Sequence, residues 1–223
     1  MKTSELMLDT RQRILRDARG RVFDLATHEW RAEETTLTGK RIGASDALRW
    51  LQRDSGHPRR EPIGVIGARH ASAEEHSQAY ALGAVLAKLG CVVLCGGRGG
   101  VMRAVCEGVA SAGGVSVGLL PGDTIADGND AVTIPIATGI GLARNALIAR
   151  AALCLVAVGG RYGTISEMAY GLQFGKAVFA LHGAPAIEGV ETVASVDAAV
   201  EAVAHVALGL DRRARAAAQA AGA

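Results

Sequence analysis

Three glycine-rich segments contain the residues that could do chemistry. They read GARHAS from Gly67, GGRGGVM from Gly96 and GGRYGT from Gly159. A glycine-rich turn in front of a helix lets backbone N–H groups converge on an anion, and the helix dipole adds partial positive charge. If the three segments meet at one edge of a sheet, they predict a site for a phosphate-bearing molecule.

None of these segments is a standard nucleotide loop. No Gly-Lys-Ser or Gly-Lys-Thr follows, so none is a P-loop. None fits G-x-G-x-x-G between a strand and a helix, and no acidic residue ends the second expected strand to hold a ribose. A dinucleotide dehydrogenase is therefore disfavoured.

The candidate binding residues come from these segments and from one asparagine outside them. Arg69 and Arg98 could reach a phosphate, or they could be ordinary exposed loop residues. Tyr162 could stack on a base or pack against the neighbouring helix. The residues predicted to bind phosphate or nucleotide are Gly67, Arg69, Gly97, Arg98, Gly99, Gly100, Met102, Asn145, Gly159, Gly160, Arg161, Tyr162, Gly163 and Thr164.

Arg144 and Glu167 are the candidate catalytic residues. Thr164 and Glu167 are three residues apart, so they fit a capping box; the alternative is that Glu167 faces the ligand. Arg144 opens an expected helix, where a cation opposes the helix dipole. A bound anion would relieve that conflict, although an arginine that reaches back to solvent would also be ordinary.

Composition limits the function classes. The chain has 223 residues, with 24 Lys+Arg, 22 Asp+Glu and a net charge of +2, so bulk charge does not favour binding to a nucleic-acid polymer. Four cysteines lie in apolar stretches without a CxxC pair, which indicates neither a metal site nor a disulfide framework. The first residues lack an apolar signal region, and the longest apolar runs are too short to span a membrane. A cytoplasmic protein is expected.

The elements that would position these residues alternate after residue 61. Short apolar strands are expected at 63–66, 91–94, 115–120, 132–136, 153–158 and 177–181. Helical patterns separate several of them, at 73–89, after the second glycine segment, at 143–152 and from about Thr164. Wholly apolar strands separated by helices predict a doubly wound parallel sheet, an α/β Rossmann-like fold with ligands beyond the carboxyl ends of the strands.

The rest of the chain differs in composition. Residues 1–60 hold 13 Lys/Arg and 9 Asp/Glu, and the stretch SGHPRREP has the character of a linker. We therefore expect a small N-terminal extension at 1–60 containing a hairpin and a helix, a Rossmann-like nucleotide-binding domain at 61–210, and an Ala/Arg-rich tail at 211–223.

Three strings carry a family resemblance. They are GGRGGVMRAVCEGVASAGGVSVGLLP, NDAVTIPIATGIGLARN and VAVGGRYGTISEMAYGL, in that order. The run from Ile63 to His182 resembles the LONELY GUY-like (SLOG) Rossmann superfamily, and the string TGIG followed by RN favours the branch of the molybdenum-cofactor carrier proteins.

The resemblance implies roles for particular residues. Hydrolases of this superfamily cleave the N-glycosidic bond of nucleoside 5′-monophosphates and carry a PGG-x-GT-xx-E motif with an upstream Arg-Lys pair. Here the glycines from Gly159 and Thr164 match the phosphate loop, Glu167 matches the acidic position and Arg144 matches the arginine. Val158 replaces the proline, the loop has one extra residue, and Asn145 replaces the lysine.

These observations leave three functions open. The first is hydrolysis of a nucleoside 5′-monophosphate, in which Glu167 stabilises an oxocarbenium-like state and Arg144 holds the phosphate or the base. The second is a non-catalytic carrier of molybdenum cofactor or another phosphorylated ligand. The third is an oligomeric nucleotide-sensing scaffold. No metal or other cofactor is required beyond a bound nucleotide or molybdenum cofactor, and a homo-oligomer, dimer or tetramer, is expected.

Overall fold

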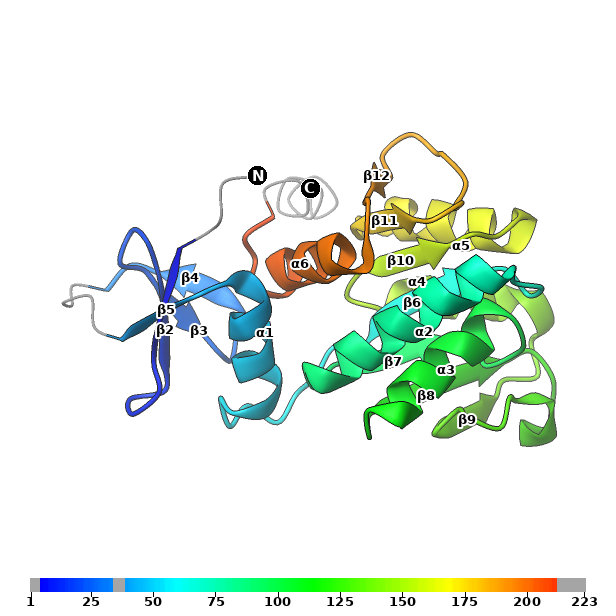
Figure 1. The fold of residues 1–223 in the computed structure, drawn as a ribbon, viewed down its shortest axis with the longest axis horizontal. Helices are drawn as coiled ribbons and strands as arrows, with labels where there is room; N and C mark the ends of the chain where they lie inside the picture. The colour runs from blue at the N-terminus through cyan, green and yellow to red at the C-terminus, as the bar shows by residue number, and fades with distance from the viewer. Residues whose placement is uncertain (1–4, 34–38, 212–223) are drawn as a thin grey trace.

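The computed structural model describes residues 5–33 and 39–211, and it contains two sheets (Figure 1). The larger is a seven-stranded parallel sheet covered by helices, and the smaller is an antiparallel sheet near the N-terminus. The predicted α/β Rossmann-like fold with a small N-terminal extension is therefore confirmed. Of the predicted tail at 211–223, all residues after Asp211 lie outside the described part of the chain.

The parallel sheet runs in the order β12-β11-β10-β6-β7-β8-β9. Strand β6 is therefore central, and the chain continues to one side through β7 to β9 and to the other through β10 to β12. Such a sheet has its switch point between β6 and β10, where ligands bind at the carboxyl ends. The strands are β6 (Ile63–Gly67), β7 (Val92–Cys95), β8 (Val115–Leu120), β9 (Ile134–Ala137), β10 (Leu155–Val158), β11 (Val178–Leu181) and β12 (Glu191–Thr192).

Helices cover both faces of this sheet. On one face α2 packs against α3 and α6, and on the other α4 packs against α5. Neighbouring residues of β6 alternate between these layers, since Val65 belongs to the core under α2, α3 and α6 and Ile66 to the core under α4 and α5. The helices are α2 (Ala73–Lys88), α3 (Val101–Ser111), α4 (Arg144–Ala151), α5 (Tyr162–Gln173) and α6 (Val196–Ala207), with short 3-10 turns η1 (Ile125–Asp127) and η2 (Gly141–Ala143).

The fourth strand of this domain starts later than its apolar pattern predicts. A strand was expected from Val132, but β9 begins at Ile134. The backbone N–H of Thr133 donates to Ser116 Oγ at 3.0 Å, and the N–H of Ser116 donates to Thr133 Oγ1 at 3.1 Å. These side-chain oxygens take the hydrogen bonds that carbonyls would accept in a ladder, so regular pairing begins one residue further on.

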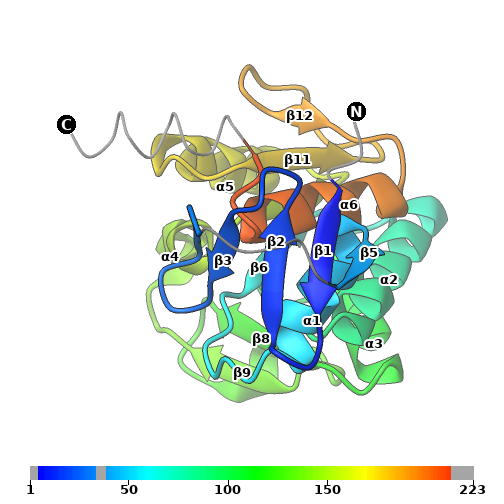
Figure 2. The same ribbon diagram turned by 90° about the vertical axis from the view of Figure 1, so that its left-hand side faces the viewer.

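The N-terminal unit is a five-stranded antiparallel sheet followed by a helix (Figure 2). The sheet order is β4-β3-β2-β1-β5, and helix α1 (Ala44–Arg53) follows it. This unit contacts α6, because Trp30 Nε1 donates to the Leu208 carbonyl at 2.6 Å and Ser45 Oγ donates to Glu201 Oε2 at 2.7 Å. The strands are β1 (Leu6–Asp9), β2 (Ile14–Asp17), β3 (Val22–Asp24), β4 (Glu29–Arg31) and β5 (Lys40–Ile42).

Within the described residues, no helix has the length and apolar character needed to cross a membrane.

Candidate functional site

A cavity of about 520 Å³ lies at the carboxyl ends of the central strands. Its walls come from the loops after β6, β7, β8 and β10 and from the starts of α2, α3, α4 and α5. This is the switch point of the sheet, where the connections on either side of β6 separate. The lining residues are Gly67, Ala68, Arg69, His70, Glu75, Arg98, Met102, Pro121, Leu142, Arg144, Asn145, Gly160, Arg161, Gly163, Thr164 and Glu167.

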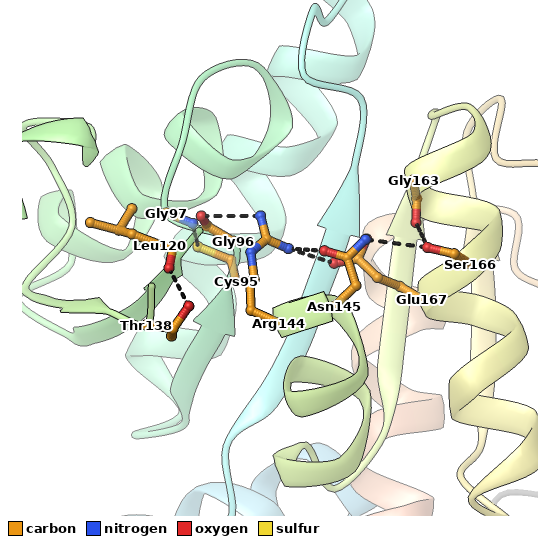
Figure 3. A network of polar contacts seen from close by, with 10 residues as sticks. All are labelled: Cys95, Gly96, Gly97, Leu120, Thr138, Arg144, Asn145, Gly163, Ser166 and Glu167. Carbon is orange, nitrogen blue, oxygen red and sulfur yellow. Dashed lines mark hydrogen bonds and ion pairs between the residues drawn. The ribbon is translucent and has the colours of Figure 1, made fainter. Parts of the chain in front are cut away.

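Arg144 connects two walls of the cavity (Figure 3). Its Nη1 donates to Glu167 Oε1 at 3.3 Å and to the side-chain oxygen of Asn145, and its Nη2 donates to the Gly96 carbonyl at 3.4 Å. The side chain is only 5% exposed. The guanidinium therefore links the loop after β7 to α5, and it lies across the cavity instead of reaching back to solvent.

Gly96 is needed for this arrangement. A Cβ at this position would overlap Nη2 of Arg144 and lie 2.7 Å from Met102 Sδ. Any larger residue would displace the guanidinium or the methionine, so the glycine in this loop permits close approach of a side chain to the backbone.

The charges on Arg144 and Glu167 are poorly solvated. Burial raises the pKa of Glu167 to about 7, although Arg144 opposes the shift. Burial also lowers the pKa of Arg144, Glu167 acts against that shift, and the nearby positive charge of Arg98 lowers it further. Among the described residues, Nε of Arg144 has no acceptor. A bound anion would supply that acceptor and reduce the repulsion between the two arginines.

Glu167 does not cap its helix. Helix α5 begins at Tyr162 with Arg161 as the N-cap residue, and no side chain caps it. Of the two arrangements that the spacing of Thr164 and Glu167 allowed, the capping box is therefore wrong: the helix starts before Thr164, and the Glu167 carboxylate lines the cavity and pairs with Arg144. Thr164 is 2% exposed and lies close to Gly160, whose φ of +111° puts it in a region that favours glycine.

Three of the four helices that start at the cavity share a feature that α2 lacks. Helices α3, α4 and α5 have no acidic residue in the first turn and no capping side chain. The first N–H groups of a helix have no partner within the helix, and the dipole makes this end positive. The first N–H groups of α3 and α4 already have acceptors, since Val101 N–H donates to the Ala68 carbonyl at 2.9 Å and Arg144 N–H donates to carbonyls of η2. An anion in the cavity would therefore be stabilised by the positive ends of the helix dipoles together with the arginines.

The cavity brings together most of the predicted residues. Eleven line it: Gly67, Arg69, Arg98, Met102, Arg144, Asn145, Gly160, Arg161, Gly163, Thr164 and Glu167.

Five predicted residues lie outside it. Tyr162 is 87% exposed and does not line the cavity. Gly159 faces the Glu75 carboxylate, and the Gly97 carbonyl accepts from Asn129 Nδ2 at 3.0 Å. Gly99 and Gly100 line a neighbouring hollow.

Five lining residues were not predicted from the sequence, and one of them, Glu75, lies in a recognisable sequence motif. Ser72 and Glu75 form a capping box on α2: the Ser72 hydroxyl accepts from the Glu75 N–H at 3.1 Å, and the Glu75 carboxylate accepts from the Ser72 N–H at 2.7 Å. Ser-x-x-Glu before a helical pattern predicts this motif. The other missed residues are Ala68, His70, Pro121 and Leu142.

No group of three or more His, Cys, Asp or Glu residues with the geometry to hold a metal ion occurs within the described ranges 5–33 and 39–211. The four cysteines are buried and unpaired by disulfides.

One family model matches most of the chain. The model of the SLOG cluster4 family matches residues 60–207. An uncharacterized protein from Archaeoglobus fulgidus is 43% identical over 138 residues, which are 62% of this chain and 91% of that protein.

Two solved structures also resemble the chain. The molybdenum cofactor binding protein from the phototrophic bacterium Rippkaea orientalis is 32% identical with a TM-score of 0.62, over 66% of this chain and 96% of that one. The molybdenum cofactor carrier protein from Chlamydomonas reinhardtii is 35% identical with a TM-score of 0.61, over 66% of this chain and 98% of that one.

Proposed function

This chain belongs to the SLOG cluster4 family, and we propose that it is a binding or carrier protein for a phosphorylated, nucleotide-like small molecule. The ligand occupies the cavity at the carboxyl ends of β6, β7 and β10. Its phosphate lies between Arg98 and Arg144, beside the start of α5.

One observation carries this proposal: positive groups without partners converge on the cavity. Arg69, Arg98 and Arg161 line it and have no carboxylate partner within the described part of the chain. The buried Nε of Arg144 has no acceptor there either. Arg69 and Arg161 are exposed to solvent and Arg98 is half-buried, so the unfavourable burial without an acceptor applies to Arg144 alone. A phosphate in the cavity would accept charge-assisted hydrogen bonds from these arginines.

Molybdenum cofactor is the cargo that the relatives suggest. The cavity of about 520 Å³ lies in the range of about 300–1,000 Å³ that small-molecule sites occupy. The residues of the site fit the phosphate end of such a cargo through Arg98, Arg144 and the start of α5. Molybdenum chemistry would belong to the cargo, and this chain would bind and orient it.

Hydrolysis of a nucleoside 5′-monophosphate is the second candidate. The observation that favours it is the position of Glu167, a carboxylate that lines the cavity and whose pKa is raised to about 7. Near neutral pH this group could hold or release a proton beside a breaking ribosyl–base bond. The ion pair with Arg144 at 3.3 Å limits this role, because the same carboxylate oxygen already accepts from the guanidinium.

The binding proposal is tested on the full chain. Native mass spectrometry of the purified protein should show a bound phosphorylated compound, or calorimetry should show binding of AMP, GMP, CMP, UMP or molybdenum cofactor released from a molybdoenzyme. Arg98→Ala should weaken the binding by about tenfold or more, since it removes one charge-assisted contact. Arg49→Ala, at an exposed arginine of α1 outside the cavity, is the control. Absence of binding to every compound, with no co-purified ligand, would overturn the proposal.

Turnover is tested with the same nucleotides. If the protein is a phosphoribohydrolase, chromatography detects free base, and Glu167→Gln lowers its rate of release by about 10²–10⁴-fold while the nucleotide still binds. Binding without release of base selects the carrier function. Equal turnover by both proteins excludes Glu167 from catalysis.

We also propose that copies of the chain associate in a reducing compartment such as the cytoplasm. Exposed apolar side chains support association, among them Leu142 at 76% and Ile125 at 60% exposure. The four unpaired buried cysteines suit a reducing compartment. Light scattering at micromolar concentration should show a dimer or tetramer; a monomer would contradict the association.

A further inference from the structure

A second hollow of about 490 Å³ adjoins the ligand cavity. Arg69, His70 and Arg98 line both, so the two hollows meet at these side chains. The second hollow continues along the loop after β7 to Gly99, Gly100 and Arg103, and η1 and Asn129 close its other side. Each hollow alone has a volume within the range of small-molecule sites.

The charges around the second hollow favour an anion. Neither Arg69 nor Arg98 has a carboxylate partner among the residues that the structure describes. Arg103 does, because its Nε donates to Glu107 Oε1 at 2.8 Å. The acidic lining residue, Asp127, has its carboxylate against the backbone of Gly122. Arg69, which is exposed, and Arg98, which is half-buried, therefore stand between the hollows with no balancing carboxylate among the described residues.

The backbone of the loop after β7 also favours an anion in the second hollow. Asn129 Nδ2 donates to the carbonyls of Gly97 at 3.0 Å and Arg98 at 3.1 Å. These two oxygens face the asparagine and already have a donor, so they do not turn their negative ends toward an anion. At Gly99 a Cβ would meet only the Arg69 carbonyl, at 3.6 Å. The hollow is therefore open at this position, and the absence of a side chain leaves room for a ligand.

We propose that the site takes a ligand with two phosphate-linked parts, a dinucleotide-like molecule whose pyrophosphate lies between the two hollows. Arg69 and Arg98 contact the pyrophosphate from the boundary, one part of the ligand fills the main cavity, and the other lies beside Gly99 at the start of α3. This inference rests on the proposed function and extends it, because a nucleoside monophosphate would leave the second hollow empty.

The test compares AMP with ADP-ribose by calorimetry on the full chain. ADP-ribose carries the same nucleoside phosphate and adds a second phosphate and a ribose, so it should bind about tenfold or more tightly than AMP. Gly99→Asp places a carboxylate in the second hollow and should lower the affinity for ADP-ribose by about tenfold or more, with a smaller effect on AMP. Gly99→Asn has nearly the same size without the charge and should keep the preference for ADP-ribose.

The outcomes separate this inference from the proposed function. If AMP binds and ADP-ribose binds no more tightly, or if Gly99→Asp and Gly99→Asn have equal effects, the second hollow is not part of the site and the inference is wrong. The binding function then stands. If neither the nucleotides nor any other phosphorylated ligand binds, the proposed function fails, and the inference fails with it. Circular dichroism of both Gly99 variants checks that they fold.

Discussion

The helix starts of the Rossmann-like domain fall into two groups. Helices α2 and α6 begin with a serine cap: Ser72 accepts from the Glu75 N–H, and Ser195 accepts from the Ala198 N–H, both at 3.1 Å. Each also has an acidic residue in its first turn. Helices α3, α4 and α5 have neither. The first group is capped by side chains of its own first turn. In the second group no side chain caps the helix, although the Val101 N–H donates to the Ala68 carbonyl at 2.9 Å and the Arg144 N–H donates to carbonyls of η2.

Helix α2 starts beside the cavity and yet belongs to the capped group. Glu75 lines the cavity, yet its carboxylate accepts from the Ser72 N–H at 2.7 Å and faces Gly159. The start of α2 is therefore already neutralised. This restricts the anion-binding part of the cavity to the starts of α3, α4 and α5.

The largest effect is expected from the cation at the start of α4. Arg144→Met leaves the Glu167 carboxylate buried without its partner, so the free energy of unfolding at pH 8 should fall by about 3–5 kcal/mol. The loss should be smaller at pH 5, where Glu167 is protonated. Urea denaturation measures it, with Arg150→Met at the exposed end of the same helix as the control. Arg150 lies 5.1 Å from the centre of the Phe174 ring, a contact worth about 0.5–1 kcal/mol. Equal losses would mean that the Arg144–Glu167 ion pair contributes no more to stability than the surface contact of Arg150.

The stability contributed by the contact between α4 and α5 should depend on pH, whereas that of the capped helices should not. Because the pKa of Glu167 rises from the ordinary 4.5 to about 7, the folded protein binds this proton more tightly than the unfolded chain. Wild-type stability relative to Glu167→Gln should therefore fall as the pH rises from about 4.5 to about 7, by at most about 3 kcal/mol, and then level off. Urea denaturation across pH 4.5–8 measures the difference. A difference that does not vary with pH would mean that Glu167 titrates normally.

Removing a cap should have an intermediate effect. Ser72→Ala and Ser195→Ala should each lower the free energy of unfolding by about 1 kcal/mol, because the N–H that each serine binds loses its acceptor. Arg161→Ala, at the N-cap position of α5, should change stability by less, since Arg161 makes no capping hydrogen bond. Thermal unfolding of the three variants compares them. A cost at Arg161 as large as at the serines would remove the distinction between the groups.

Adding a cap should have the smallest effect on stability and a clear effect on binding. Arg161→Asp gives α5 a capping carboxylate and should stabilise the protein by up to about 1 kcal/mol. It also removes a cation from the cavity and adds an anion, so binding of the phosphorylated ligand should weaken. Arg161→Asn supplies a cap without the negative charge and should weaken binding less. Calorimetry measures the affinity of each variant for the ligand. An unchanged affinity in Arg161→Asp would place the phosphate away from α5.

Local patterns predicted much of the Rossmann-like domain. Strand β8 has the predicted bounds, Val115 to Leu120, because a glycine pair precedes its apolar run and Pro121-Gly122 ends it. The order of the strands depends on long-range pairing and could not be read locally. The same holds for the small sheet, where Leu6 pairs with Ile42 across the unit and strands of three or four residues give almost no pattern.

The candidate site was predicted in its residue types but not in its contacts. The glycine segments and Arg144 could be found because their chemistry is visible in sequence. That Glu167 pairs with Arg144 instead of capping α5 depends on where α5 begins and on how α4 packs against it. The spacing of Thr164 and Glu167 fits both arrangements, so only the three-dimensional structure decides between them.

The hydrogen bond from Trp30 to the Leu208 carbonyl ties the first fifth of the chain to its last described helix. The small N-terminal unit is therefore packed against the Rossmann-like domain and is part of the same folded structure. Deleting this unit would expose apolar surface on α6 and leave Glu201 without the hydrogen bond from Ser45. Ending the chain before Leu208 would remove the carbonyl that accepts from the Trp30 indole. Engineered fragments that follow the family boundary at residue 60 should accordingly aggregate more readily than the intact chain, even if their ligand cavity is complete.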